Sequence, residues 1–126
     1  MTLIASRFIF IVTNRGMLFV LLRNLIENGI KYNNSTHPII KIKLDENENF
    51  FTFSVSDNGI GIEQKYHDRI FGLFKRLHNR ESYEGSGLGL SISKKVVNRL
   101  NGEIWLESVS DNGSTFYFTI PKVNLN

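Results

Sequence analysis

The chain has 126 residues, a formal net charge of +3 and no cysteine. The length fits a single domain over residues 1–126, and the apolar share of 41% is ample for a core. The lack of cysteine excludes disulfides and thiolate metal sites, and the mild, scattered positive charge does not favour nucleic-acid binding. No stretch approaches the ~20 apolar residues that span a bilayer, so we expect a cytoplasmic domain without membrane contact.

The N-terminal part of the chain predicts a strand, a helix and a second strand. Residues 6–12 are rich in β-branched and aromatic side chains, which is typical of a strand. Thr13 or Asn14 can cap a helix that continues to about Tyr32, where a polar cluster ends it. Residues 39–44 alternate between apolar side chains and lysine, which predicts a half-buried strand.

Three polar residues recur on one face of the predicted helix. Asn24, Asn28 and Lys31 are spaced four and three residues apart, so their side chains lie above one another and can converge on one ligand. Two carboxamides and an ammonium suit oxygen-rich anions and the hard cations that accompany them. A solvated helix face would show the same pattern.

The strand that begins at Phe50 ends in an acidic residue and a glycine-rich turn. Its apolar alternation continues to Asp57, whose carboxylate then faces the apolar side and needs hydrogen bonds to offset its burial. Gly59 and Gly61 follow and allow the backbone to approach a neighbour closely. An aspartate that caps its own turn is an alternative to a ligand site.

The middle of the chain predicts a lid. Residues 63–74 favour a short helix, and residues 75–84 are polar and charged with few core positions. This polar segment lies between an aromatic anchor, Phe71 and Phe74, and a glycine hinge at Gly85, which is how a lid over a site would be built. We place the lid at residues 75–89.

The third informative stretch is a glycine-rich loop, Gly-Ser-Gly-Leu-Gly-Leu at residues 85–90, followed by a helix to about Leu100. Such a loop presents main-chain N–H groups and the positive end of a helix dipole, a combination that binds phosphate. The spacing matches neither the dinucleotide fingerprint nor the P-loop. A flexible loop with a tight helix entry is the alternative. The predicted buried stripe of this helix is Ile92, Val96, Val97 and Leu100.

The C-terminal part predicts a β-hairpin. Asn101-Gly102 stops the preceding helix, and residues 103–108 and 114–120 alternate as strands on either side of a turn that ends in Asn-Gly. Trp105 is expected in or beside the core.

Together the three stretches describe a nucleotide site without a P-loop, and an apolar slot with one acidic acceptor favours adenine over guanine. Their order resembles the ATP-binding catalytic domain of sensor histidine kinases, a branch of the GHKL ATPase superfamily. The resemblance runs from about Arg15 to Pro121 and covers four motifs: an asparagine box at residues 24–32, a first glycine box at 57–62, a phenylalanine box at 70–76 and a second glycine box at 85–90.

The resemblance implies an α/β (α+β) two-layer sandwich, with a mixed, mostly antiparallel sheet, helices packed on one face and an ATP lid. It also implies ATP and Mg²⁺ as ligands. Asn28 would hold the magnesium that bridges the ATP phosphates, with Asn24 beside it. Lys31 would reach a phosphate, Tyr32 would lie against adenine, and Asp57 would accept a hydrogen bond from the adenine amino group.

Loop residues complete the implied nucleotide site. Gly59 and Gly61 would give room for the base, while the glycines of the second glycine box would form the lid hinge and contact the phosphates. Arg76 and Arg80 would hold the triphosphate or a partner domain. The resemblance assigns further nucleotide contacts to Ile62, Phe74, Arg76, Gly85, Ser86, Gly87, Leu88 and Gly89.

The asparagine box indicates phosphoryl transfer rather than hydrolysis. Hydrolytic members of the superfamily place a glutamate one helical turn before the metal asparagine, as the general base for water. The chain has Asn24 at that position, and an amide cannot take up the proton of water at neutral pH. A smaller departure is Gly29, where the family usually has alanine.

The expected phosphoacceptor histidine is missing. No histidine precedes Asn24, and we interpret His37, His67 and His78 as surface or packing residues. The chain alone is therefore expected to bind ATP, to be monomeric and not to phosphorylate itself. Its partners would be a histidine-bearing dimerisation domain, on the same parent chain or a separate one, and a response regulator downstream.

Two other functions fit the same motifs. One is a non-enzymatic module that senses a nucleotide or binds a protein. The other is a serine kinase of the anti-sigma type, which resembles the same superfamily.

Overall fold

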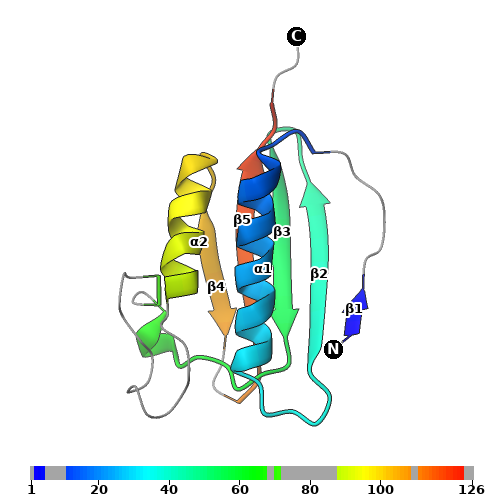
Figure 1. The fold of residues 1–126 in the computed structure, drawn as a ribbon, viewed down its shortest axis with the longest axis vertical. Coiled ribbons are helices and arrows are strands. Elements are labelled where there is room, and N and C mark those ends of the chain that lie inside the picture. The colour runs from blue at the N-terminus through cyan, green and yellow to red at the C-terminus, as the bar shows by residue number, and fades with distance from the viewer. Residues whose placement is uncertain (1, 5–10, 68–69, 72–87, 109–110, 124–126) are drawn as a thin grey trace.

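Two helices cover one face of a five-stranded sheet in the computed structural model of the chain, which describes residues 2–4, 11–67, 70–71, 88–108 and 111–123 (Figure 1). The strand order is β1-β2-β3-β5-β4, with β1 parallel to β2 and the other neighbours antiparallel. This arrangement confirms the predicted two-layer α+β fold. The elements are β1 (Thr2–Ile4), α1 (Arg15–Lys31), β2 (Ile39–Glu46), β3 (Phe50–Asp57), a 3₁₀ helix (Gln64–Tyr66), α2 (Leu88–Arg99), β4 (Ile104–Ser108) and β5 (Ser114–Pro121).

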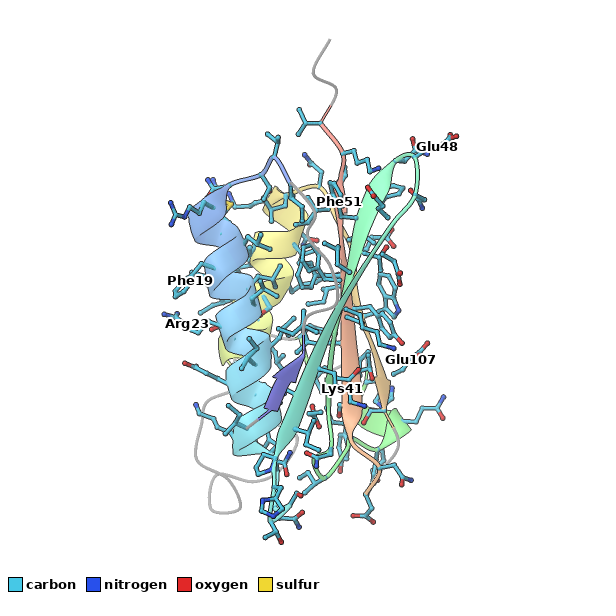
Figure 2. The ribbon with its side chains drawn as sticks, turned by 90° about the vertical axis from the view of Figure 1, so that its right-hand side faces the viewer. Phe19, Arg23, Lys41, Glu48, Phe51 and Glu107 are labelled. Atoms are coloured by element: carbon cyan, nitrogen blue, oxygen red, sulfur yellow. The ribbon has the colours of Figure 1, made fainter. Side chains whose placement is uncertain are left out.

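Helix α1 confirms the helix predicted to continue to about Tyr32, and its cap is Asn14 rather than Thr13. The Asn14 side chain accepts a hydrogen bond from Met17 N at 3.0 Å and so satisfies one of the free N–H groups of the first turn. Leu21, Leu25 and Gly29 are buried against the sheet. Figure 2 shows the opposite face of α1, where Phe19 and Arg23 lie away from the sheet.

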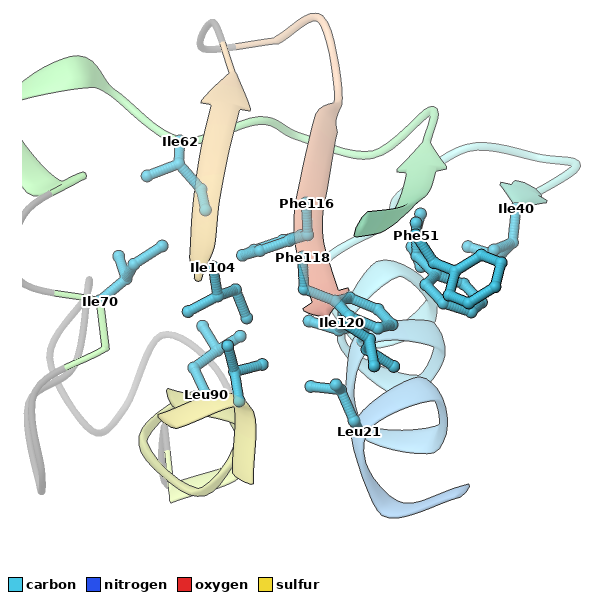
Figure 3. Packing of buried hydrophobic residues seen from close by; sticks show 14 residues of the cluster. Leu21, Ile40, Phe51, Ile62, Ile70, Leu90, Ile104, Phe116, Phe118 and Ile120 are labelled. Carbon is cyan, nitrogen blue, oxygen red and sulfur yellow. The ribbon is translucent and has the colours of Figure 1, made fainter. Parts of the chain in front are cut away.

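The core lies between the two layers and is rich in phenylalanine (Figure 3). Alternate residues of β3 and β5 face the helices, and the rings of Phe53 and Phe118 stack with their centroids 4.7 Å apart. Phe116 and Phe118 are almost completely buried. Trp105 lies beside the core rather than in it, because its side chain belongs to the outer face of the sheet and stacks on Tyr117.

Helix α2 ends at the predicted place, but its buried stripe differs by one position. Asn101 adopts a left-handed φ of 63°, and Gly102 N donates to Val97 O at 2.9 Å, which closes the helix end with a Schellman motif. Ile92 is 42% exposed, whereas Ser93 is fully buried, so the prediction was wrong for Ile92. The core-facing position that the apolar pattern assigned to Ile92 is thus taken by the small hydroxyl side chain of Ser93.

Two other predictions differ from the structure. The strand expected at residues 6–12 lies mostly outside the described residues, and its end at Ile11 and Val12 is not a strand. The short helix expected at 63–74 is reduced to the 3₁₀ helix in the described part. Glu63 makes no capping hydrogen bond there, and the ring of His67 bonds to the main chain at Ile62 O instead.

Removal of the central ring of this core tests the packing. Phe118→Ala is expected to lower the free energy of unfolding by about 3–5 kcal/mol, because it deletes a fully buried ring that neighbouring side chains cannot replace. Chemical denaturation measures the loss, with Lys43→Ala on the exposed face of β2 as the control. Equal effects of the two substitutions would contradict this packing.

Candidate nucleotide-binding site

A narrow pocket opens between the C-terminal end of α1 and the carboxyl end of β3. Its walls come from three segments that are far apart in the sequence, namely helix α1, the turn after β3 and the start of β5. Seven residues line it: Asn28, Tyr32, Asp57, Ile60, Gly61, Ile62 and Ser114. Five of these belong to the predicted site, so the structure brings the asparagine box and the first glycine box together.

Asp57 is half-buried at the base of this pocket. Its Oδ1 atom accepts hydrogen bonds from Gly59 N at 2.8 Å and from Ser114 N at 3.3 Å. Burial raises the pKa of the Asp57 carboxyl above its ordinary value of 3.8, and these two main-chain hydrogen bonds oppose the rise. In the described part of the chain no donor is bonded to Oδ2, so this oxygen is available to accept a hydrogen bond from a ligand.

Gly29 allows α1 to lie directly against Asp57. A Cβ atom at this position would lie 3.0 Å from Asp57 Cβ, 3.2 Å from Asp57 Oδ2 and 2.7 Å from Ile40 Cδ1. The missing side chain therefore lets the helix approach the end of β3 more closely than an alanine would without adjustment. Since Asn28 and Tyr32 flank this contact on the same helix, it sets how near they lie to the carboxylate.

The turn after Asp57 is held by main-chain groups on both sides. Ile60 N donates to Tyr32 O at 3.0 Å, while Ile60 O accepts from Asp111 N. A Cβ atom at Gly59 would collide with Tyr32 O, and Gly61 has a φ of 73°, so each glycine is required for its own reason. The predicted close backbone approach is therefore confirmed at Gly59, whereas Gly61 is needed for its left-handed backbone conformation.

Two serines contribute to the site that the sequence motifs did not single out. Ser108 Oγ accepts from Ile62 N at 2.7 Å and donates to Gly113 O at 2.8 Å. It also lies 2.8 Å from the Ser114 hydroxyl, which belongs to the pocket wall. In the sequence, these two serines are marked only by being small polar residues at inward-facing strand positions, where apolar residues are expected.

The other predicted site residues either lie outside the pocket wall or outside the described part of the chain. Asn24 is half-buried one turn before Asn28, and Lys31 is exposed at the end of α1; neither lines the pocket. Leu88 and Gly89 begin α2 rather than a loop, as a glycine-rich entry into a helix requires. Several predicted residues lie outside the described part of the chain, namely Phe74, Arg76, Arg80, Gly85, Ser86 and Gly87.

Comparison with known proteins agrees with this geometry. A profile of the family described as histidine kinase-, DNA gyrase B- and HSP90-like ATPase matches residues 13–124. The chain belongs to this ATPase family. None of the helices in the described part is long and apolar enough to cross a membrane.

Relatives in this ATPase family include sensor kinases. The chain is 47% identical over 111 residues to the phytochrome-like protein Cph1 of Synechocystis, a match that covers 88% of this chain and 15% of the relative. It is 33% identical over 119 residues to the sensor histidine kinase WalK of Bacillus subtilis, covering 92% of this chain and 20% of that protein. The chain therefore spans only about a fifth or less of the length of these relatives.

A solved structure of the catalytic domain of the histidine kinase ThkA has the same fold. Its TM-score is 0.75 at 30% sequence identity, and the match covers 90% of this chain and 73% of that one. The order of helices and strands around the pocket is therefore that of a histidine kinase catalytic domain.

The burial of Asp57 predicts a dependence of stability on pH. Because the pKa is raised in the folded chain, the folded state retains the proton to higher pH than the unfolded state. Stability therefore falls as the pH rises from 3.8 through the folded pKa. Asp57→Asn has no charge to bury, so its free energy of unfolding should not fall over this pH range. The variant should therefore be more stable than the parent at neutral pH.

Denaturant unfolding over a pH series from below 3.8 to neutral measures this difference. The advantage of Asp57→Asn should shrink at the acidic end, where the parent carboxyl is protonated in both states. Asp45→Asn, on the exposed face of β2, is the matched control. A variant that is less stable than the parent at neutral pH would contradict the predicted cost of burying the charge.

Proposed function

We propose that the chain is the ATP-binding catalytic domain of a sensor histidine kinase. In this proposal it holds ATP with Mg²⁺ and presents the γ-phosphate to a histidine on a dimerisation domain. The observation that carries the proposal is Asp57, in a chain of this ATPase family: main-chain N–H groups are bonded to its Oδ1, while none of the described residues donates to its Oδ2.

Adenine fits the chemistry of this pocket. The exocyclic amine of adenine donates to Asp57 Oδ2, whereas guanine and hypoxanthine present a carbonyl oxygen at that point of the ring and would be repelled. Ile60 and Ile62 provide apolar walls for the flat base, and Tyr32 lies against its face. Ser114 supplies a hydroxyl beside the same edge.

Helix α1 would hold the metal end of the nucleotide. Asn28 offers one hard amide oxygen, and the described residues contain no cluster of three or more His, Cys, Asp or Glu side chains that could hold a metal ion by themselves. Such a site fits a magnesium ion that arrives with the ATP phosphates and keeps most of its other ligands from them and from water. The bound ion would neutralise charge on the phosphates. From the same helix, Asn24 would lie beside Asn28 at the metal end, and Lys31 would reach a phosphate.

The chain would bind the phosphates but leave the acceptor to another domain. Asn24 cannot act as a base for water, so the γ-phosphate persists until a histidine nitrogen attacks it. The bond to the β–γ bridging oxygen then breaks and ADP leaves. The glycines of residues 85–89, within a lid at 75–89, would contact the phosphates. We place this chemistry in the cytoplasm, with the isolated chain monomeric and a response regulator downstream.

Nucleotide titration is the first test. Calorimetry should show that the parent chain binds ATP with Mg²⁺ and that Asn28→Ala and Asp57→Asn each weaken binding by about tenfold or more, since each removes a contact worth about 1.4 kcal/mol or more. Asn98→Ala, an exposed asparagine on α2, should leave the affinity unchanged. No binding by the folded parent would overturn the proposal.

The identity of the acceptor is tested by labelling. With radiolabelled ATP, a histidine-bearing dimerisation domain added to the chain should become labelled, and the label should survive base but be lost in acid. The chain alone should stay unlabelled. A label that survives acid but not base would favour the anti-sigma-type serine kinase, and binding without transfer to any acceptor would favour a non-enzymatic module.

A further inference from the structure

The two walls of the pocket are joined by a short loop that is not itself part of the pocket. Asn28 and Tyr32 lie at the end of α1, and Asp57 lies at the end of β3. Residues 33–38 lead from α1 into β2, which pairs with β3 up to Ile40 opposite Asp57. The position of this loop therefore bears on the separation of the two walls.

Asn58 is the residue that ties this loop to the turn after Asp57. Its Oδ1 accepts from Asn33 Nδ2 at 2.8 Å and from Ile39 N at 2.9 Å. Its Nδ2 donates to His37 O at 3.1 Å and to Ser35 Oγ at 3.4 Å. The carboxamide thus uses both of its acceptor positions and both of its donor hydrogens.

The orientation of this carboxamide follows from its partners. The main-chain nitrogen of Ile39 can only donate, so the atom of Asn58 that faces it is the oxygen. The main-chain oxygen of His37 can only accept, so the atom that faces it is the nitrogen. No other side chain of similar size offers two acceptor and two donor positions in this arrangement.

The partners of Asn58 are themselves braced within the loop. Ser35 N donates to Asn33 Oδ1 at 2.9 Å, and His37 N donates to Ser35 Oγ at 3.3 Å. The loop is therefore held as one unit by local side-chain bonds, and Asn58 fixes that unit at several points. Since Ile39 is the first residue of β2, the Asn58 side chain also extends the β2–β3 ladder beyond its last main-chain pair.

The residue after Asn58 holds the other side of the same junction. Gly59 packs directly against Tyr32 O, and Ile60 N donates to that same oxygen at 3.0 Å. The turn after β3 therefore contacts the end of α1 through its backbone and the following loop through the Asn58 side chain. Together these contacts leave the two walls little freedom to separate.

We propose that Asn58 is a positioning residue for nucleotide binding. Its carboxamide holds the loop of residues 33–38 against the turn after Asp57 and so maintains the distance between Asn28 and Asp57 that the Gly29 contact sets. This inference rests on the proposed function, in which Asn28 serves the metal end and Asp57 the base end of one ATP. A ligand that must reach both ends at once depends on that distance.

Two substitutions separate the bonds that Asn58 makes. Asn58→Ala removes all four. Asn58→Asp keeps the two accepted bonds but places an oxygen opposite His37 O and so loses that bond, while the Ser35 hydroxyl can donate to the new oxygen instead of accepting. Asn34→Ala, an exposed asparagine in the same loop, is the matched control.

The experiment measures two quantities on the parent and the three variants. Amide hydrogen exchange of the nucleotide-free protein follows Ile60 N–H, whose acceptor is Tyr32 O, relative to the amides of β5. Calorimetry then gives the affinity for ATP with Mg²⁺. We expect Asn58→Ala to accelerate Ile60 exchange and to weaken binding, each by about tenfold, with Asn58→Asp between it and the parent and Asn34→Ala unchanged.

The outcomes are distinct. Unchanged Ile60 exchange in Asn58→Ala would overturn the proposal, and so would faster exchange with unaltered affinity, because Asn58 would then be only a structural clamp. If Asn58→Ala does not fold, Asn58→Asp carries the same comparison. A parent chain that binds no ATP would overturn the proposed function, and the proposed role in binding with it, whereas loss confined to the Asn58 variants supports both.

Discussion

The contact between helix α1 and the end of strand β3 is the constraint on which the site depends. Gly29 leaves no side chain between the helix and Asp57, so a helix residue and a strand carboxylate share one pocket. Two glycines in the turn after β3 lie beside this contact. Gly59 has no side chain that would collide with the carbonyl oxygen of Tyr32. Gly61 adopts a left-handed φ of 73° in the turn that follows. Ile40 of the core cluster packs against the same glycine as Asp57, Gly29, and so joins this contact to the core.

The half-burial of Asp57 lowers the stability of the folded chain but provides a group that can bind a ligand. A half-buried carboxylate is destabilising, and two main-chain donors at Oδ1 only partly offset its desolvation. An apolar residue at this place would strengthen the core, yet it would leave a ligand with no acceptor. The same logic applies to Ser108 and Ser114, which occupy inward positions in β4 and β5 and bond to one another and to the backbone of the pocket.

The sequence predicted the site best where its determinants are local. A cap at Thr13 or Asn14 and the alternation of β3 depend on neighbouring residues; the structure has the cap at Asn14, and the alternation was correct. In the described part, the helix expected after Glu63 is only the 3₁₀ helix Gln64–Tyr66, and the ring of His67 bonds to Ile62 O, a contact that apolar periodicity cannot predict. Ser108 and the clamp at Asn58 were missed because their partners are brought together only by the fold. The role of Gly29 against Asp57 was hidden for the same reason.

The stacked pair of Trp105 and Tyr117 has a spectroscopic consequence. Trp105 is the single tryptophan of the chain, and its ring lies 5.3 Å from that of Tyr117 on the outer face of the sheet, 37% exposed. The helices and the nucleotide pocket belong to the opposite side of the same sheet. Intrinsic fluorescence excited at the indole should therefore follow the loss of the sheet during unfolding, while it remains nearly silent to whatever fills the pocket.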